Sequence, residues 1–280
     1  MPTNRTIVIS DGVTLNAIEA GSGHPLIMIP GWSQSAAEYG RNIEALAKGC
    51  HVIALDMRSH GSSMNMKTGH RIQRLAKDLS EVIDALGFAS VDLLGHSMGS
   101  SVIWSYLDLF GPAKLRKLVL IDQSPMAAAL PGWSALEKTK YGCLLADVQA
   151  VAALCDTVRA TSSVEGTMAI LRGMFTAKMP EADLRWIAEE NLKMPRGAAA
   201  DLLFDHCLND WRDVIENIRL PTLVVGGRKS IFSAESQEWI ASVNPNARAS
   251  IFEEDEGGGH FMFFENPNRF NAEVAGFLAS

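Results

Sequence analysis

The sequence predicts an α/β protein in which helices cover both faces of a mostly parallel sheet. Short apolar segments, typical of strands buried on both faces, alternate along most of the chain with segments of helical periodicity. This alternation indicates βαβ connections, which build parallel sheets. Residues 126–205 interrupt it with helical segments alone. We therefore expect a core domain formed by residues 1–125 and 206–280, with residues 126–205 inserted as a helical cap over the carboxyl edge of the sheet.

The strands are predicted from their hydrophobic patterns. Residues 6–10 and 14–20, joined by Asp11-Gly12, have the pattern of an antiparallel hairpin. The segments expected to form buried strands share a short, apolar composition: 25–30, 51–57, 91–94, 117–121, 221–225 and 247–252.

The helices are predicted between and after these strands. In residues 72–86 the apolar side chains recur on one helical face, and Gly87 supplies the stop. The other helices expected in the core are 98–110, which Gly111-Pro112 closes, 234–243 and 267–278.

Composition narrows the class of protein. The chain has 280 residues, which is enough for one large domain with an insertion. Its formal net charge of −7 argues against nucleic acid or an anionic membrane as the partner, and a small-molecule substrate is expected instead. No signal-peptide core or apolar run of the ~18 residues that a membrane span needs is present, so we expect a cytoplasmic protein. The sequence leaves open whether the chain forms a homodimer.

The cysteines give no sign of a metal or a disulfide framework. Cys50, Cys143, Cys155 and Cys207 are dispersed along the chain without metal-like spacing. In a chain without an export signal, such cysteines are expected to be reduced thiols. We expect no metal and no cofactor.

Residues 91–99 carry the strongest functional signal. An apolar run ends in Gly95-x-Ser97-x-Gly99, and a helix-compatible segment follows at once. This is the pattern of a nucleophile elbow, a strand-to-helix turn so tight that its central residue is strained. Ser97 is therefore the predicted nucleophile.

A serine hydroxyl is a weak nucleophile that needs a base, and the base needs an acid to orient it. In the order Ser–acid–His the base comes late, and His260, preceded by Gly257-Gly258-Gly259, is the predicted base. The other histidines are weaker candidates: His24 and His51 at strand starts, His60 in a turn, His96 pointing away from the nucleophile, and His70 and His206 on segments expected to be exposed.

The acid is harder to place. A carboxylate is expected after the strand at 221–225, but Ser230 stands at that position. The next strand end that can supply one is followed by Asp122, which we predict to orient His260, with Ser230 supporting the pair. The alternative is that Asp122 only caps a turn. Glu235 and the acidic run 253–256 are the fallback candidates.

The oxyanion hole and the pocket are predicted from neighbouring loops. An oxyanion needs two backbone N–H groups, and those of Trp32 and Met98 have the right positions after strand ends. Gln34 is expected to line the pocket. The further side chains expected at the substrate are Trp133, Trp186 and Phe261.

Together these segments resemble the α/β-hydrolase fold superfamily over nearly the whole chain outside the cap. The segments that carry the resemblance are the oxyanion loop Pro30-Gly31-Trp32, the turn 56–63 with Ser59 replacing a glycine, the elbow 95–99, the strand 221–227 and Gly259-His260. The resemblance implies the α/β-hydrolase fold and an enzyme with a catalytic triad.

Within the superfamily, some esterases and the cofactor-free dioxygenases that cleave 4-quinolone rings place the acid as Asp122 would be here. These dioxygenases also have a Pro-Gly-Trp loop, but they tend to carry histidines where this chain has Gln34 and Met98. The Ser-Met-Gly form is common among esterases, lactonases and non-haem haloperoxidases.

The sequence therefore favours a serine hydrolase that cleaves an apolar carboxylic ester or lactone through an acyl-enzyme on Ser97. The alternative is a cofactor-independent dioxygenase that cleaves a 3-hydroxy-4-quinolone-type ring with a His260–Asp122 dyad. A non-catalytic binding module on the same fold is the third hypothesis.

Overall fold

The computed structural model describes residues 1–280 and contains one eight-stranded sheet, in the order β1-β2-β4-β3-β5-β6-β7-β8. The pairs β1–β2 and β2–β4 are antiparallel, and every other pair is parallel. This confirms the predicted α/β class with a mostly parallel sheet. The strands are β1 Thr3–Val8, β2 Thr14–Gly21, β3 Pro25–Ile29, β4 His51–Leu55, β5 Val91–His96, β6 Leu115–Ile121, β7 Thr222–Gly227 and β8 Ala247–Phe252.

Helices follow most of the parallel strands. Those of the core are α1 Ile43–Leu46, α2 Ile72–Leu86, α3 Met98–Phe110, α10 Ala234–Val243, α11 Met262–Glu265 and α12 Pro267–Ala279. Those between β6 and β7 are α4 Ala135–Lys140, α5 Val148–Ala160, α6 Val164–Leu171, α7 Glu181–Asn191, α8 Arg196–Leu208 and α9 Arg212–Glu216.

The sheet separates two hydrophobic clusters because successive side chains of a strand point to opposite faces. In β3, Ile27 and Ile29 belong to the cluster beneath α2, α3 and α10, whereas Leu26 and Met28 belong to the cluster beneath α1, α11 and α12. All four side chains are fully buried. Such double burial explains why the central strands are continuous apolar runs rather than alternating ones.

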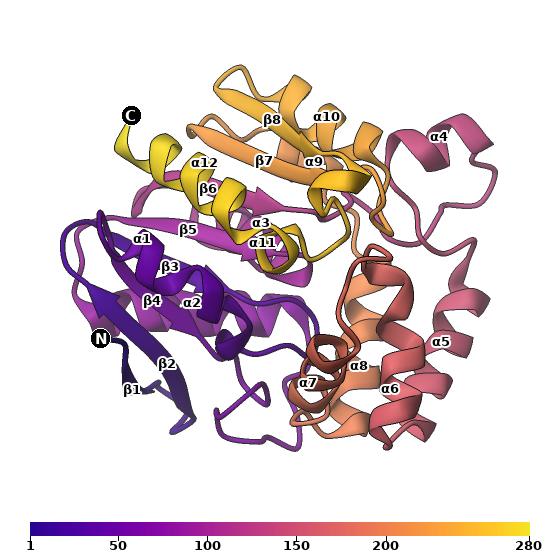
Figure 1. Cartoon of the computed structure of the whole chain (residues 1–280), viewed down its shortest axis with the longest axis horizontal. Coiled ribbons are helices and arrows are strands. Elements are labelled where there is room, and N and C mark those ends of the chain that lie inside the picture. The colour runs from indigo at the N-terminus through magenta and orange to yellow at the C-terminus, as the bar shows by residue number, and fades with distance from the viewer.

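The helices between β6 and β7 gather beside the sheet, where α5, α6, α7 and α8 form a group of their own (Figure 1). They share both hydrophobic clusters with the core, through Leu202 of α8 in one and Ile187 of α7 in the other. The boundary expected at 205/206 falls inside α8, so the inserted segment continues through α9.

A short helical segment after β3 has no counterpart among the predicted elements. It consists of a 3₁₀ helix at Ala36–Arg41 and then α1. Long-range contacts hold it: the Ala36 N–H donates to Asp56 Oδ1 at 2.7 Å, and the Tyr39 hydroxyl donates to the Ile29 carbonyl at 2.9 Å. Because these partners come from elsewhere in the chain, local periodicity does not reveal the segment.

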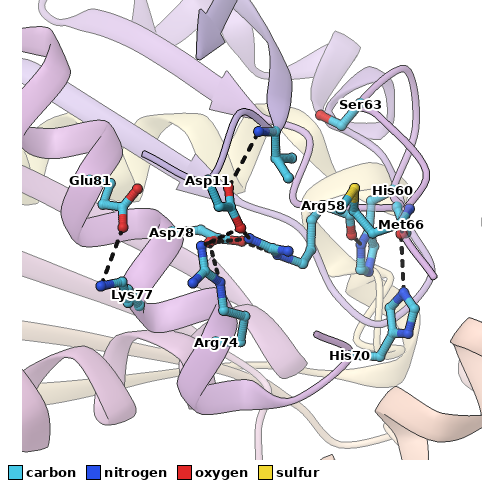
Figure 2. A network of polar contacts seen from close by, with 12 residues as sticks. Asp11, Arg58, His60, Ser63, Met66, His70, Arg74, Lys77, Asp78 and Glu81 are labelled. Atoms are coloured by element: carbon cyan, nitrogen blue, oxygen red, sulfur yellow. Dashed lines mark hydrogen bonds and ion pairs between the residues drawn. The ribbon is translucent and has the colours of Figure 1, made fainter. Parts of the chain in front are cut away.

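A buried ionic network fixes the turn after β4. Figure 2 shows Arg58 of this turn between Asp11 of the first hairpin and Asp78 of α2. The Arg58 guanidinium donates to both carboxylate oxygens of Asp78, at 2.5 and 2.6 Å, and to Asp11 at 3.0 Å. Arg58 is 3% exposed and Asp78 is fully buried, so this pair joins the turn to α2 away from solvent, while the contact with Asp11 lies nearer the surface.

None of the helices combines the length and the apolar character that crossing a bilayer requires. All four cysteines are free.

Candidate active site

The candidate site residues lie at the carboxyl edge of the sheet. Ser97 directly follows β5 and Asp122 directly follows β6, while Ser230 and His260 stand in the loops after β7 and β8. The backbone continues the strand pairing here, since the Ser97 N–H donates to the Ile121 carbonyl at 2.7 Å. Parallel strands bring their carboxyl ends to one edge, which is why residues so far apart in sequence meet.

Ser97 occupies a strained turn between β5 and α3. Its backbone angles are φ 52° and ψ −125°, a conformation that side chains of L-residues rarely adopt. Glycines flank it for steric reasons: a Cβ at Gly95 would lie 2.6 Å from the backbone of Gly99, and a Cβ at Gly99 would lie 2.4 Å from the Ile29 carbonyl oxygen. The geometry is that of the nucleophile elbow.

His260 is held by the acid that the sequence predicts. Its Nδ1 lies 2.5 Å from Asp122 Oδ2, and both side chains are buried. The Ser230 hydroxyl donates to the same carboxylate oxygen and lies 3.5 Å from His260 Nδ1. Nδ1–H thus points at the carboxylate, and the other ring nitrogen, Nε2, is left without a protein partner. A ring held in this tautomer can accept a proton at Nε2.

Burial controls the protonation of this pair. It lowers the pKa of His260 to about 3, so the ring of the free enzyme is neutral at pH 7. Burial also raises the pKa of Asp122 well above its ordinary value, and the hydrogen bond from Ser230 acts against that rise. Two donors on one oxygen, from Ser230 and His260, stabilise the carboxylate form of this fully buried side chain.

Two backbone N–H groups beside Ser97 have no backbone acceptor. Met98 is the first residue of α3, where N–H groups lack an intrahelical partner. Trp32 lies in the loop after β3, and its N–H makes no backbone hydrogen bond. These are the two donors expected for an oxyanion hole.

Gln34 fixes the loop that carries Trp32. Its Oε1 accepts from the Gly31 N–H at 3.1 Å and lies 3.0 Å from His96 Nδ1. His96 is fully buried, and its Nε2 lies 2.9 Å from the His260 carbonyl oxygen. Both ring nitrogens of His96 are thus engaged by groups other than Ser97, and the ring connects the oxyanion loop to the histidine loop.

An apolar cavity of about 280 Å³ opens on these residues. Ser97 and His260 line it together with Trp32, Gln34 and side chains of α5, α6 and α8. Larger grooves on the surface contain none of the residues Ser97, His260 or Asp122. Ser97 and His260 therefore share one apolar cavity.

Comparison with known proteins agrees with this geometry. The family model described as the alpha/beta hydrolase fold matches residues 24–154. An esterase from Exiguobacterium antarcticum superposes with a TM-score of 0.89 at 24% identity, over 99% of this chain and 100% of that one. This chain has the α/β-hydrolase fold.

The chain also has relatives in sequence. It is 25% identical to a non-heme haloperoxidase from Rhodococcus erythropolis, over 98% of this chain and 99% of the relative. A soluble epoxide hydrolase from a Corynebacterium strain is 35% identical, but that match covers 41% of this chain and only 40% of the relative.

Three residues expected at the substrate lie elsewhere in the structure. Trp133 packs on Tyr141, with ring centroids 5.0 Å apart, and Trp186 stacks on Phe264 at 6.0 Å. Phe261 is fully buried against Phe175. None of them lines the cavity. The fallback acids are also remote, because Glu235 and most of 253–256 are exposed and the ring of His260 bonds only to Asp122 and Ser230.

His206 is the reverse case, because it lies at the cavity although it is not expected there. The sequence predicts an exposed position for it, whereas in the structure it is 5% exposed and lines the cavity. The helical pattern of α8 is weak because residues on several sides of the helix are buried. No sequence signal marks His206 as a residue of the site.

Proposed function

We propose that this α/β hydrolase is a serine hydrolase that cleaves a carboxylic ester or lactone of apolar character through an acyl-enzyme on Ser97. One observation carries the proposal: Ser97 and the Asp122-held His260 open on the same apolar cavity. An apolar chamber of about 280 Å³ suits a small ester better than a charged metabolite. We also propose that helices α4 to α9 act as the cap over this cavity.

The first step is acylation. The Ser97 oxygen attacks the ester carbonyl carbon while His260 Nε2 removes its proton, and the carbonyl π electrons move onto oxygen. The N–H groups of Trp32 and Met98 stabilise that oxyanion. When the intermediate collapses, the bond to the alkoxide breaks, and His260 returns the proton to the leaving alcohol.

The second step is hydrolysis of the acyl-enzyme. A water molecule gives a proton to His260 Nε2 and attacks the acyl carbon, which forms a second oxyanion in the same hole. Collapse breaks the bond to Ser97 oxygen, and the serine recovers its proton from His260. Asp122 holds the imidazolium formed in both steps and does not itself take up the proton.

The test is turnover of p-nitrophenyl esters by the wild-type protein and by Ser97→Ala, together with labelling by a fluorophosphonate. We expect Ser97→Ala to lose turnover by several orders of magnitude and to lose the label. Ser101→Ala is the matched control, because Ser101 is a buried serine of the same helix with no hydrogen-bond partner. Equal turnover by wild type and Ser97→Ala would refute the proposal.

The dioxygenase alternative uses the same His260–Asp122 pair but needs no nucleophile. The strained Ser97 and the two free N–H groups favour acyl transfer, because a reaction that uses only a base leaves them without a role. Oxygen uptake with a 3-hydroxy-4-quinolone, unchanged in Ser97→Ala, would support the alternative instead.

A further inference from the structure

His206 is a polar side chain in a wall that is otherwise apolar. It comes from α8 and lines the same cavity as Ser97 and His260. Its neighbours in that wall are Leu203, on the same helix, and Leu154 and Val158 of α5. The side chain is 5% exposed.

The imidazole of His206 has no partner in the protein. Nδ1 is buried without a hydrogen bond, and none of the side-chain hydrogen bonds of the protein involves His206. Buried polar groups are nearly always hydrogen-bonded, so an exception needs an explanation. His60 is also buried with one unpaired ring nitrogen, and its pKa is also lowered to about 4. It differs because its Nδ1 lies 2.9 Å from the Arg58 carbonyl oxygen and because it does not line this cavity.

His206 is neutral in the free protein. Burial, together with a smaller effect of the neighbouring His260, lowers its pKa to about 4. A neutral imidazole offers one N–H donor and one lone-pair acceptor. It can therefore bind a hydroxyl or a carbonyl oxygen, but it has no charge to offer a carboxylate or a phosphate.

We propose that His206 is a substrate-binding residue that hydrogen-bonds an uncharged oxygen lying outside the scissile ester group. This inference rests on the proposed function and narrows its substrate class to esters or lactones whose apolar part carries one hydroxyl or keto oxygen. The surrounding leucine and valine side chains contact the hydrocarbon part of the substrate. The hydrogen bond from His206 determines where on that part the additional oxygen must lie.

The test compares esters that differ by one oxygen. We would measure kcat/KM for p-nitrophenyl pentanoate and hexanoate and for their 4-oxo and 5-oxo counterparts, and take the ratio of oxo ester to plain ester. For the best-placed oxo ester, His206→Leu is expected to lower this ratio roughly tenfold to hundredfold. His206→Gln keeps a donor and an acceptor and is expected to restore part of it.

Leu203→Ala is the matched control. This substitution changes the volume of the same wall without removing a polar group. The kcat/KM values of the oxo ester and the plain ester should therefore change together, and their ratio should stay within about threefold of the wild-type ratio. The proposal is overturned if His206→Leu leaves the ratio unchanged for every oxo ester, or if Leu203→Ala changes it as much.

A second measurement separates this proposal from the proposed function. We would titrate cyclohexanone and its apolar analogue methylenecyclohexane into wild-type, His206→Leu and His206→Gln proteins by calorimetry. His206→Leu should lose the preference for the ketone, and this result would stand even if no ester were cleaved. Ester hydrolysis through Ser97 without any ketone preference would overturn the His206 proposal alone.

Thermal unfolding distinguishes binding from a structural role. Replacing an unpaired buried imidazole by leucine among apolar neighbours should leave the melting temperature of the free protein unchanged or raise it. A lower melting temperature, combined with an unchanged ester ratio, would make His206 structural. If His206→Leu does not fold, the ratio and the calorimetry with His206→Gln decide, since that variant keeps the hydrogen-bonding groups.

Discussion

The contact between His260 Nδ1 and Asp122 Oδ2 determines which ring nitrogen can act as a base. With the proton held on Nδ1 by a carboxylate 2.5 Å away, Nε2 is free to take the proton of Ser97. The sequence places Asp122 by elimination, because Ser230 stands where a carboxylate is expected. In the structure Ser230 is not a substitute acid but a donor to Asp122.

Asp122→Asn should therefore abolish most of the activity. An amide cannot hold the required tautomer, and we expect kcat for an ester to fall by about 10⁴. Ser230→Ala keeps the acid and removes one donor, so a fall of roughly tenfold is expected. Steady-state kinetics of both variants is the measurement, and a near-normal rate for Asp122→Asn would remove Asp122 from the triad.

The pH dependence of kcat/KM should reflect the buried imidazole. The base must be neutral, so activity is lost as pH falls through the pKa of His260. Because burial lowers that pKa to about 3, we expect the acid limb far below the ordinary 6.5, with a plateau that reaches pH 5. Circular dichroism at each pH checks that the fold persists. An acid limb at pH 6.5 or above would contradict the prediction that the base is a buried histidine with a lowered pKa.

At the scale of elements, the loops after the strands are positioned by contacts with distant segments. The Trp32 indole N–H donates to the Ala199 carbonyl of α8 at 2.7 Å, and the Ser33 hydroxyl donates to the Asn191 carbonyl at 2.7 Å. The His260 N–H likewise donates to the Met174 carbonyl. The inserted helices therefore hold both the oxyanion loop and the histidine loop.

The network around Arg58 should contribute strongly to stability. Asp78→Asn removes the buried counter-charge of Arg58 and leaves only the more exposed Asp11, so we expect the free energy of unfolding to fall by about 3–5 kcal/mol. Lys77→Ala, which breaks the exposed Lys77–Glu81 pair on the same helix, should change it by less than about 0.5 kcal/mol (Figure 2). Urea denaturation of the two variants is the measurement. Similar losses of unfolding free energy in both variants would show that the contribution of the network to stability does not depend on its burial.

At the scale of the whole molecule, core and inserted helices share their hydrophobic clusters. Residues of α8 belong to the cluster that covers one face of the sheet, and residues of α7 belong to the other. Segments that share buried surface are expected to lose structure together.

We therefore expect a single unfolding transition. Far-UV circular dichroism and tryptophan fluorescence should give the same midpoint, and Leu202→Ala in α8 should lower both by an equal amount, at a cost of about 2–5 kcal/mol. Leu136→Ala is the control, because Leu136 is 78% exposed on α4. A separate early transition that only the fluorescence detects would show that the inserted helices unfold on their own.

Local sequence information accounts for most of the fold. The apolar runs predict the parallel strands because double burial leaves no polar positions, and the elbow at 95–99 is visible because its glycines meet a local steric need. The short helices after β3 could not be predicted, since Asp56 and Ile29 hold them across the chain.

Strand ends and turn glycines are local features, so the fold class and the candidates Ser97, His260 and Asp122 can be predicted from the amino-acid sequence. Which side chains share the cavity is visible only in the folded molecule. Trp133, Trp186 and Phe261 pack elsewhere, whereas His206, expected on the surface, faces the candidate site. The physical reason is that a helix buried on several sides has no clear periodicity, so its pocket-facing residues are set by packing between elements.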